Sequence, residues 1–464
     1  MRIEIERFGP IKKFTYDLEK DLIITYGNNN IGKSYSMQIV YLLLKNFLRS
    51  LVNYSHVYKD TYFLSYLSFD ILKKELRDLL QNFLSSEMEI KDITEVFTQE
   101  VYTSLGKVFL PEFLNSCKNT FGNFDKMLEQ TPIIKVNCDK FKFEINLEQK
   151  EMRGMAVLKT VKLKKAEKDF YLTRKYEKTK NNLCIYVISD IESSVAVLYE
   201  QIQSHLMECI QSVSALFEDV YFLPASRSGI YSGMNSFGSI VAELSKNRSY
   251  FSKEIQFPGI SEPISDYFIT LSNIKSEGNQ KLSEYYTEIE NEILKGKVTF
   301  HKTRNALMYK PQNMDVDFEM TEVSSMVSEI SPIVAFLKYI LSSEKEEGRK
   351  KKSVLFIEEP EAHLHPNNQI ALIEIFTKII NSDVKLIMSS HSNYIFNKLN
   401  NLVLGAKLDY RVYQPILLLE EEGGSRSKTL SIDELGAEDE NFIDVSEKLY
   451  YEREEIIQKL NMEE

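Results

Sequence analysis

The sequence has 464 residues, of which 43% are hydrophobic and 27% are charged, and its formal net charge is -11. This composition is typical of a globular protein and excludes a fibrous or largely disordered chain, while the length predicts two or three folding units. The negative charge argues against a protein whose whole surface binds nucleic acid, although a local basic groove is compatible with it.

The sequence has no pattern typical of export or membrane insertion. Its start, MRIEIERFGP, lacks a continuous apolar stretch, and the apolar runs at 39–44 and 416–419 are far shorter than the roughly 18 residues of a membrane span. We therefore expect a cytoplasmic protein without a transmembrane segment. The cysteines lie far apart without a CxxC pair, which predicts reduced thiols rather than a zinc site or a disulfide framework. They are Cys117, Cys138, Cys184 and Cys209.

The first 50 residues predict short strands followed by a helix. Residues 1–26 contain three runs rich in β-branched and aromatic residues, and the last run continues directly into GNNNIGKS at 27–34. From Tyr35 onward the apolar residues recur at the spacing of one helix face. A glycine-containing loop between a strand and a helix is the setting that a phosphate-binding loop requires.

The segment at 27–34 matches the pattern G-x-x-x-x-G-K-[ST]. Its glycines allow successive backbone N–H groups to point at phosphate oxygens, Lys33 is expected to reach the β and γ phosphates of ATP, and Ser34 is expected to hold Mg²⁺. The alternative is a glycine-rich turn that binds nothing, and the flanking strand and helix argue against it. The predicted nucleotide-binding residues are Gly27, Asn28, Asn29, Asn30, Ile31, Gly32, Lys33 and Ser34.

The middle of the chain separates into regions of different periodicity. Residues 51–130 predict a helical insertion, residues 131–190 an antiparallel β meander, and residues 191–296 a helical region interrupted by the strand-like run VYFLPASRSG. Residues 297–464 again mix strands and helices, and their alternation predicts a parallel α/β sheet with ligands at the carboxyl ends of its strands. The charged runs at 345–352 and 420–428 are interpreted as solvated loops.

Two adjacent acids follow the predicted buried strand VLFI. Glu358 is expected to hold Mg²⁺ or its water, because this ion prefers hard oxygen ligands, and Glu359 is expected to orient or deprotonate the attacking water. The alternative for this segment alone is a strand that ends in a surface acid pair. The phosphate-binding loop elsewhere in the chain favours the catalytic interpretation.

A second buried strand, LIMSS, ends at His391. A neutral imidazole at this place can hydrogen-bond the γ-phosphate or the attacking water, although a lone histidine is more often structural. His363 and His365 have loop spacing, and we interpret them as packing or interface residues rather than metal ligands.

More than 320 residues separate the phosphate-binding loop from the acid pair, so a large insertion must split the ATPase head. The segments FGPIKKF, GNNNIGKS, SSMVSEISP, IEEPEAHLHP and SSHSNYI, in this order, resemble those of the ABC-type ATPases of the SMC, RecF and OLD-like superfamily. The resemblance implies an α/β fold, namely an ABC-type P-loop ATPase head with a mixed or parallel sheet and an antiparallel β subdomain, split by a helical insertion. It also implies ATP and Mg²⁺ as cofactors.

The resemblance assigns a role to Ser325. It implies that this serine is the signature residue that touches the γ-phosphate bound to a neighbouring subunit, so that a homo-oligomer shares its ATP sites. A helix N-terminus at this place would favour phosphate, although a simple N-cap serine is the alternative. The sequence departs from the superfamily at Met326, which replaces a signature glycine, and at Glu358, where many members have Asp. Arg227, in a motif similar to one of OLD-like proteins, is interpreted either as a phosphate-stabilising or as a structural arginine.

OLD-like nucleases end in a Toprim domain, and the roughly 70 residues after His391 are too few for one. The arrangement resembles two-gene anti-phage systems, most closely those of the PARIS type, and implies two partners: a separate Toprim nuclease effector and a phage-encoded trigger protein. The alternative is a DNA-binding repair or maintenance ATPase of the RecF or SMC type, whose likeliest DNA contact is the basic stretch 162–180. A scaffold that binds ATP without turning it over is a third possibility.

Overall fold

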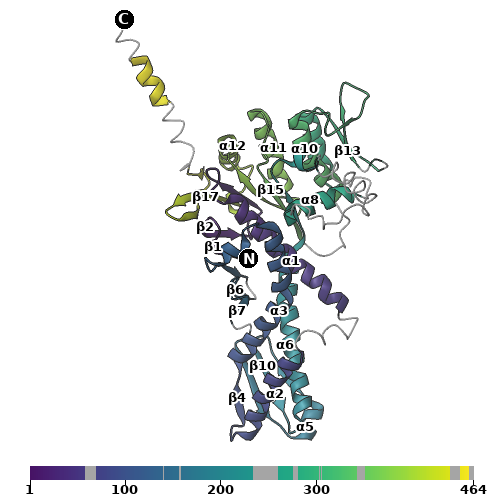
Figure 1. Cartoon of the computed structure of the whole chain (residues 1–464), viewed down its shortest axis with the longest axis vertical. Coiled ribbons are helices and arrows are strands. Elements are labelled where there is room, and N and C mark those ends of the chain that lie inside the picture. Colours follow the sequence, from purple (N-terminus) through teal and green to yellow (C-terminus); the bar gives the residue numbers. More distant parts are fainter. Residues whose placement is uncertain are drawn as a thin grey trace, which may run out of the picture. The chain divides into compact units, whose positions relative to one another are not determined.

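The computed structural model describes residues 1–57, 69–138, 141–155, 158–231, 233, 260–274, 281–302, 304, 306–341, 351–438 and 450–458. The chain forms two compact units (Figure 1). Unit 1 comprises Met1–Phe8 and Leu42–Asp219, and unit 2 comprises Gly9–Tyr41 and Val220–Glu464. Helix α1 (Lys33–Val57) therefore begins in unit 2 and ends in unit 1. Among the described helices none is long and apolar enough to cross a membrane.

Unit 2 is built on a mixed sheet. Its strands lie in the order β11-β15-β16-β3-β17-β18-β2; the pairs β15–β16, β16–β3 and β3–β17 are parallel, whereas β17 and β18 are antiparallel. Glu358 of β15 pairs with Ser389 of β16, and Ser390 pairs with Tyr26 of β3, so these strands end at one edge. The bounds are β2 (Ile11–Asp17), β3 (Leu22–Tyr26), β11 (Phe217–Leu223), β15 (Lys352–Glu358), β16 (Val384–Ser390), β17 (Tyr413–Glu421) and β18 (Gly424–Thr429).

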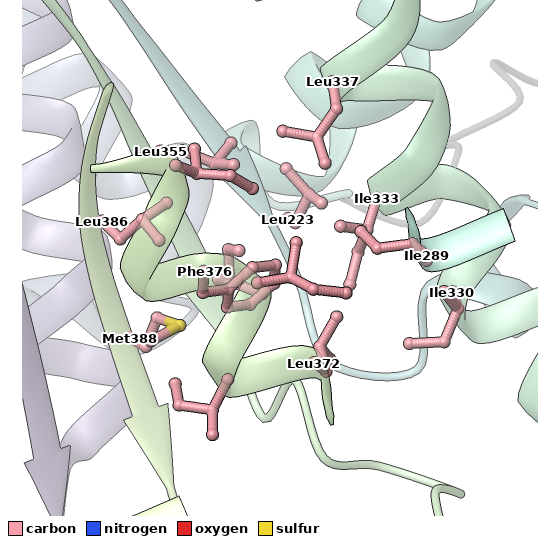
Figure 2. Close-up of a cluster of buried hydrophobic side chains, with 14 of the residues drawn as sticks. Leu223, Ile289, Ile330, Ile333, Leu337, Leu355, Leu372, Phe376, Leu386 and Met388 are labelled. Carbon is pink, nitrogen blue, oxygen red and sulfur yellow. The ribbon is translucent and has the colours of Figure 1, made fainter. Parts of the chain in front are cut away.

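Helices of unit 2 pack on this sheet through a continuous apolar core (Figure 2). Leu355 of β15 and Leu386 of β16 face Leu372 and Phe376, which lie four residues apart on one face of α11. Strand β15 is buried along almost its whole length, as expected for a parallel strand covered on both faces. The helices are α8 (Glu262–Ser272), α9 (Ser283–Glu288), η2 (Ile289–Leu294), α10 (Ser325–Ala335), η3 (Phe336–Ile340), α11 (Pro366–Ile379), α12 (Asn393–Leu404) and η4 (Tyr410–Val412).

Two small antiparallel sheets complete the described part of unit 2. One has the order β12-β13-β14, and the other is the pair β19-β20. Their strands are β12 (Gly296–His301), β13 (Ala306–Pro311), β14 (Phe318–Glu319), β19 (Ile432–Asp433) and β20 (Gly436–Ala437).

Unit 1 contains two groups of strands and long helices. Strands β1, β5, β6 and β7 pair antiparallel in that order, and a separate sheet has the order β4-β8-β10-β9. The strands are β1 (Arg2–Phe8), β4 (Ile90–Asp92), β5 (Ile133–Asn137), β6 (Lys142–Asn146), β7 (Glu151–Gly154), β8 (Thr160–Lys165), β9 (Tyr176–Lys178) and β10 (Asn182–Val187). The helices wholly within unit 1 are α2 (Phe69–Ser85), α3 (Thr94–Thr120), α4 (Phe124–Leu128), α5 (Lys168–Thr173) and α6 (Ile191–Ser214).

The α/β class with a large mixed sheet is confirmed, and two local expectations are wrong. The expected antiparallel meander holds for β5 to β7, but β8 and β10 are parallel because α5 and β9 lie between them in the chain. The charged run at 420–428 forms the β17–β18 hairpin rather than a loop. The side chains of β18 are mostly polar because, among them, only that of Ser425 is buried. Most of the other charged run, 345–352, lies outside the described residues.

Candidate functional site

The loop after β3 has the backbone conformation that its glycines allow. Gly27, Asn30 and Gly32 have φ angles of 138°, 62° and 101°. A Cβ atom on Gly27 would lie 2.6 Å from the carbonyl oxygen of Leu418, so a larger residue would displace strand β17. Ser425 donates from Oγ to the carbonyl of Ile31 at 2.7 Å, a support for the loop that sequence reasoning missed.

Lys33 is a buried cation folded over this loop. Its Nζ donates to the carbonyl oxygens of Gly27 at 2.9 Å and Asn28 at 2.6 Å. Burial lowers the pKa of Lys33 to about 8, although the nearby carboxylates of Glu359 and Glu361 oppose this shift. An ammonium group held among backbone dipoles beside curled N–H groups is suited to an anionic ligand.

Glu358 and Ser34 form an oxygen pair that fits a magnesium ion. The Glu358 carboxylate is buried at the end of β15, where Oε2 accepts from the backbone N–H of Ala225 at 3.2 Å and the carboxylate hydrogen-bonds the Ser34 hydroxyl. Burial raises the pKa of Glu358, and its Oε1 is buried without a partner among the described residues. Such an uncompensated carboxylate oxygen suits a hard divalent cation.

The protein would supply only part of the coordination of such an ion. Among the described residues no group of three His, Cys, Asp or Glu side chains is placed to hold a metal. Magnesium commonly keeps several waters and takes phosphate oxygens besides one or two protein ligands. The pair of Glu358 and Ser34 matches that requirement.

Glu359 is a partly exposed carboxylate on a strained turn. Its φ is 44°, in the left-handed region that residues other than glycine rarely adopt. Its Oε1 lies 3.5 Å from Nε2 of His391, and the hydrogen bond to His391 lowers the pKa of Glu359, with a smaller contribution from Lys33. Glu359 is therefore ionised at neutral pH, and its lowered pKa suits it better to orienting water than to removing a proton from it.

His391 lies between Lys33 of the phosphate-binding loop and Glu359 of the acid pair. Its Nδ1 lies 3.5 Å from Nζ of Lys33, while its Nε2 faces Glu359. The structure thus brings Lys33, Glu359 and His391 together within unit 2, as expected for residues at the carboxyl ends of neighbouring parallel strands.

Glu361 is a site residue that was not predicted from the sequence. Its Oε1 accepts from the backbone N–H of His391 at 2.6 Å and from Oγ of Ser390 at 2.8 Å. Burial raises the pKa of Glu361. The carboxylate therefore fixes the turn from which the His391 ring projects. Its place two residues after the acid pair, in a segment rich in charged side chains, was the available signal.

Arg227 is structural rather than directed at an open phosphate site. Its side chain is fully buried, and its guanidinium donates to the carbonyl oxygens of Glu358 at 2.7 Å and Glu359 at 3.2 Å. Its Nε lies 3.4 Å from Oε2 of Glu329, another buried residue that sequence reasoning did not single out. These contacts decide between the two interpretations of Arg227.

Ser325 is the first residue of α10 and is exposed. The N-cap of this helix is Ser324, whose side chain accepts from the backbone N–H of Val327 at 3.5 Å, so the capping role belongs to the neighbouring serine. The exposed serine is therefore free to face another molecule.

His363 and His365, the two histidines expected in a loop, precede α11. His365 is the N-cap of α11, and its Nδ1 accepts from the backbone N–H of Asn367 at 3.4 Å. His363 is exposed and has a φ of 60°. His365 thus has a structural role in this loop.

The basic stretch 162–180 lies in unit 1, and several of its cations have partners. Lys178 pairs with Glu208 at 2.8 Å, and Arg174 pairs with Glu177. Lys165 donates to the carbonyl of Ser86. The cations that are paired with acids contribute less to binding a nucleic-acid backbone.

Comparison with known proteins gives one family match. The AAA ATPase domain matches residues 1–396, which include the loop at 27–34, the acid pair and His391. A comparison with curated proteins gave no match.

Several solved structures are similar at low identity. An SMC head bound to the C-winged helix domain of ScpA is 10% identical, with 93% of this chain and 98% of that chain covered and a TM-score of 0.38. An SMC head domain with an extended coiled coil, bound to the C-terminal domain of ScpA, derived from Pyrococcus furiosus, is 11% identical, with 98% of each chain covered and a TM-score of 0.36. The SMC head domain from Thermotoga maritima is 7% identical, with coverages of 93% and 98% and a TM-score of 0.34.

Proposed function

The chain belongs to the AAA ATPase domain family, and we propose that it binds ATP with Mg²⁺ at residues 27–34 and hydrolyses it to ADP and phosphate. The observation that carries the proposal is the position of His391, 3.5 Å from both the Lys33 ammonium and the Glu359 carboxylate. A phosphate-binding cation and a water-orienting base must lie on either side of the γ-phosphate for hydrolysis. Lys33 and Glu359 contact opposite ring nitrogens of His391 within unit 2, and this arrangement supports the proposal.

Each site residue has a role in the proposed reaction. The backbone N–H groups of the loop and Lys33 bind the phosphates. Ser34 and Glu358 would hold Mg²⁺, which would offset the negative charge of the phosphates. Glu359 orients the attacking water, and His391 hydrogen-bonds the water or the γ-phosphate.

We further propose that the chain acts as a homo-oligomer whose subunits share ATP sites. The exposed Ser325 lies at the N-terminus of α10, where unpaired N–H groups and the helix dipole favour a phosphate. The resemblance to ABC-type ATPases implies that the γ-phosphate it touches would belong to a neighbouring subunit.

The biological role that we propose is control of a separate Toprim nuclease in anti-phage defence. This proposal rests on the similarity of the motif set to that of AriA, the ATPase of PARIS. The oligomer would hold the effector and release it when a phage-encoded trigger protein binds.

Two experiments test these statements separately. Turnover of ATP by the purified chain should require Mg²⁺, and Lys33→Ala should abolish both turnover and ATP binding in calorimetry, because it removes the cation that faces the phosphates. Unchanged affinity in that variant would place the nucleotide elsewhere. For the biological role, a Toprim nuclease encoded beside this chain should co-purify with it, and an ATPase that binds duplex DNA but no such nuclease would support the RecF or SMC alternative.

A further inference from the structure

Unit 2 contains a buried ion pair between two segments that meet behind the acid pair. Arg227, at the start of a short helix after β11, and Glu329, in α10, have exposures of 0% and 1%. Their Nε and Oε2 atoms lie 3.4 Å apart. Burying two charges is unfavourable unless they are paired and hydrogen-bonded, so each side chain restricts the position of the other.

The arginine side of this pair holds the strained turn at Glu359. The guanidinium donates to the carbonyl oxygens of Glu358 at 2.7 Å and Glu359 at 3.2 Å, which are the two carbonyls that flank the Glu359 Cα atom. The φ of 44° at Glu359 is unfavourable for a residue with a Cβ atom and persists only where surrounding contacts hold it. A third bond, to the carbonyl of Pro224 at 3.2 Å, anchors the guanidinium to the β11 segment.

The glutamate side fixes the same arginine to α10. Its Oε2 accepts from the backbone N–H of Arg227 at 3.0 Å, and its Oε1 accepts from the N–H of Ser228 at 3.2 Å and from its Oγ at 2.6 Å. The Glu329 carbonyl also accepts from Nε of Arg227 at 3.1 Å. Glu329 follows Ser325 by one helical turn, so the exposed N-terminus of α10 and the arginine are joined by a single short stretch of helix.

We propose that Arg227 and Glu329 are positioning residues that couple the position of α10 to the conformation of the Glu359 turn. The proposal rests on the proposed function, in which Ser325 touches the ATP of a neighbouring subunit. When that contact displaces α10, Glu329 moves with the helix. Glu329 then shifts the guanidinium of Arg227, which in turn shifts the two carbonyls on either side of the Glu359 Cα atom. Each subunit therefore orients its own catalytic carboxylate according to whether its α10 is engaged.

The test compares two ion-paired acids changed to their amide counterparts, the buried Glu329 and the partly buried Asp21. Glu329→Gln removes the charge that holds Arg227. Asp21→Asn is the matched control. Asp21 pairs at 3.1 Å with Lys385, whose side chain is 4% exposed. This pair lies where β3 and β16 begin, at the edge of the sheet opposite the site. For each variant the melting temperature, ATP affinity, turnover and backbone hydrogen exchange of residues 325–331 and 359–364 are measured in the full chain.

We expect Glu329→Gln to keep ATP affinity within about threefold and to lose about 100-fold in turnover, the scale of a small misplacement of a catalytic group. Hydrogen exchange should become faster in both segments together. Asp21→Asn should lower the melting temperature but leave turnover and exchange at 359–364 unchanged. Arg227→Lys is a second variant: it keeps the positive charge but cannot bond both carbonyls, so turnover should again fall while affinity is retained.

Wild-type turnover and unchanged exchange at 359–364 in Glu329→Gln, with only a lower melting temperature, would show that the pair is a core brace and overturn the proposal. If Glu329→Gln does not fold, the same comparison is made with Arg227→Lys. If the wild-type chain fails to hydrolyse ATP, the proposed function is wrong, and the exchange measurement still decides whether α10 and the Glu359 turn are coupled.

Discussion

The imidazole Nε2 of His391 lies 3.5 Å from a carboxylate oxygen of Glu359, and the other ring nitrogen lies 3.5 Å from the Lys33 ammonium. One ring thus stands between the group that is proposed to bind phosphate and the group that is proposed to orient water. A γ-phosphate that enters here must exchange contacts with all three side chains. Changes in the bound nucleotide are therefore expected to alter the position of the histidine first.

The lowered pKa of Lys33 predicts that ATP affinity decreases as the pH rises through the alkaline range. Phosphates favour the charged ammonium, and burial lowers the pKa of this group to about 8 in the free protein. Below pH 8 the lysine is already charged. Above pH 8 it must take up a proton on binding, so affinity should fall by up to about tenfold per pH unit. Calorimetry between pH 7 and pH 9.5 measures this dependence.

Lys33→Arg is the control for that titration, since a guanidinium remains charged throughout this range. Its affinity is expected to be lower than that of the wild type but flat with pH. A wild-type affinity that is equally flat would contradict the lowered pKa of Lys33.

Glu359→Gln is expected to trap the ATP-bound oligomer. The amide preserves the shape of the side chain but removes the negative charge that orients the attacking water, so turnover should fall by about 10² to 10⁴ while ATP remains bound. Light scattering with ATP should show a more persistent oligomer than for the wild type. Glu420→Gln, at an exposed acid of β17, is the matched control and should leave both quantities unchanged. Normal turnover in Glu359→Gln would place the base on another residue.

Mixing two inactive variants should restore activity if the ATP site is shared. Lys33→Ala removes one half of a site and Ser325→Trp blocks the other half, so each alone should be inactive. A mixed interface pairs one intact loop with one intact serine and should recover part of the wild-type turnover. Turnover should also rise more steeply than linearly with protein concentration where the oligomer dissociates. Full specific activity in a monomer, together with no recovery in verified mixed oligomers, would rule out the shared site.

Glu361→Gln should affect turnover more than ATP binding. The carboxylate fixes the backbone N–H of His391 and Oγ of Ser390, and an amide can replace only part of these interactions. We expect turnover to fall about tenfold with ATP affinity nearly unchanged. Because burial raises the pKa of Glu361, its protonation at acid pH begins above the range of an ordinary glutamate. In a plot of turnover against pH, the variant should therefore lack the decrease at acid pH that is due to protonation of Glu361. If the variant and the wild type show the same decrease, another group causes it.

Positions that depend on local sequence were predictable, whereas positions that depend on distant packing were not. Glu358 and His391 lie at or just after the ends of buried strands, Lys33 begins the helix that follows β3, and parallel strands bring their carboxyl ends together. The partners of Arg227 come from α10 and from the end of β15, over 100 residues away in the sequence. No periodicity encodes that meeting.

The hairpin β17–β18 is a second feature that local sequence did not predict. Its charged residues predict a solvated loop, yet β17 and β18 are interior strands of the sheet, and only Ser425 of β18 is buried. The parallel pairing of β8 and β10 likewise depends on which strands meet rather than on their composition. Strand partners are chosen by the whole fold, whereas strand propensity is local.

Strand β17 determines how short a working fragment of this protein can be. The AAA ATPase domain match ends at residue 396, which invites expression of a piece that stops there. Such a piece would lack β17, which pairs along the whole of β3 and brings Leu418 against Gly27. The side of β3 that pairs with β17 would then become an open edge available to other chains, and the truncated protein should aggregate rather than bind nucleotide. The shortest useful fragment must therefore extend through Thr429, where β18 ends.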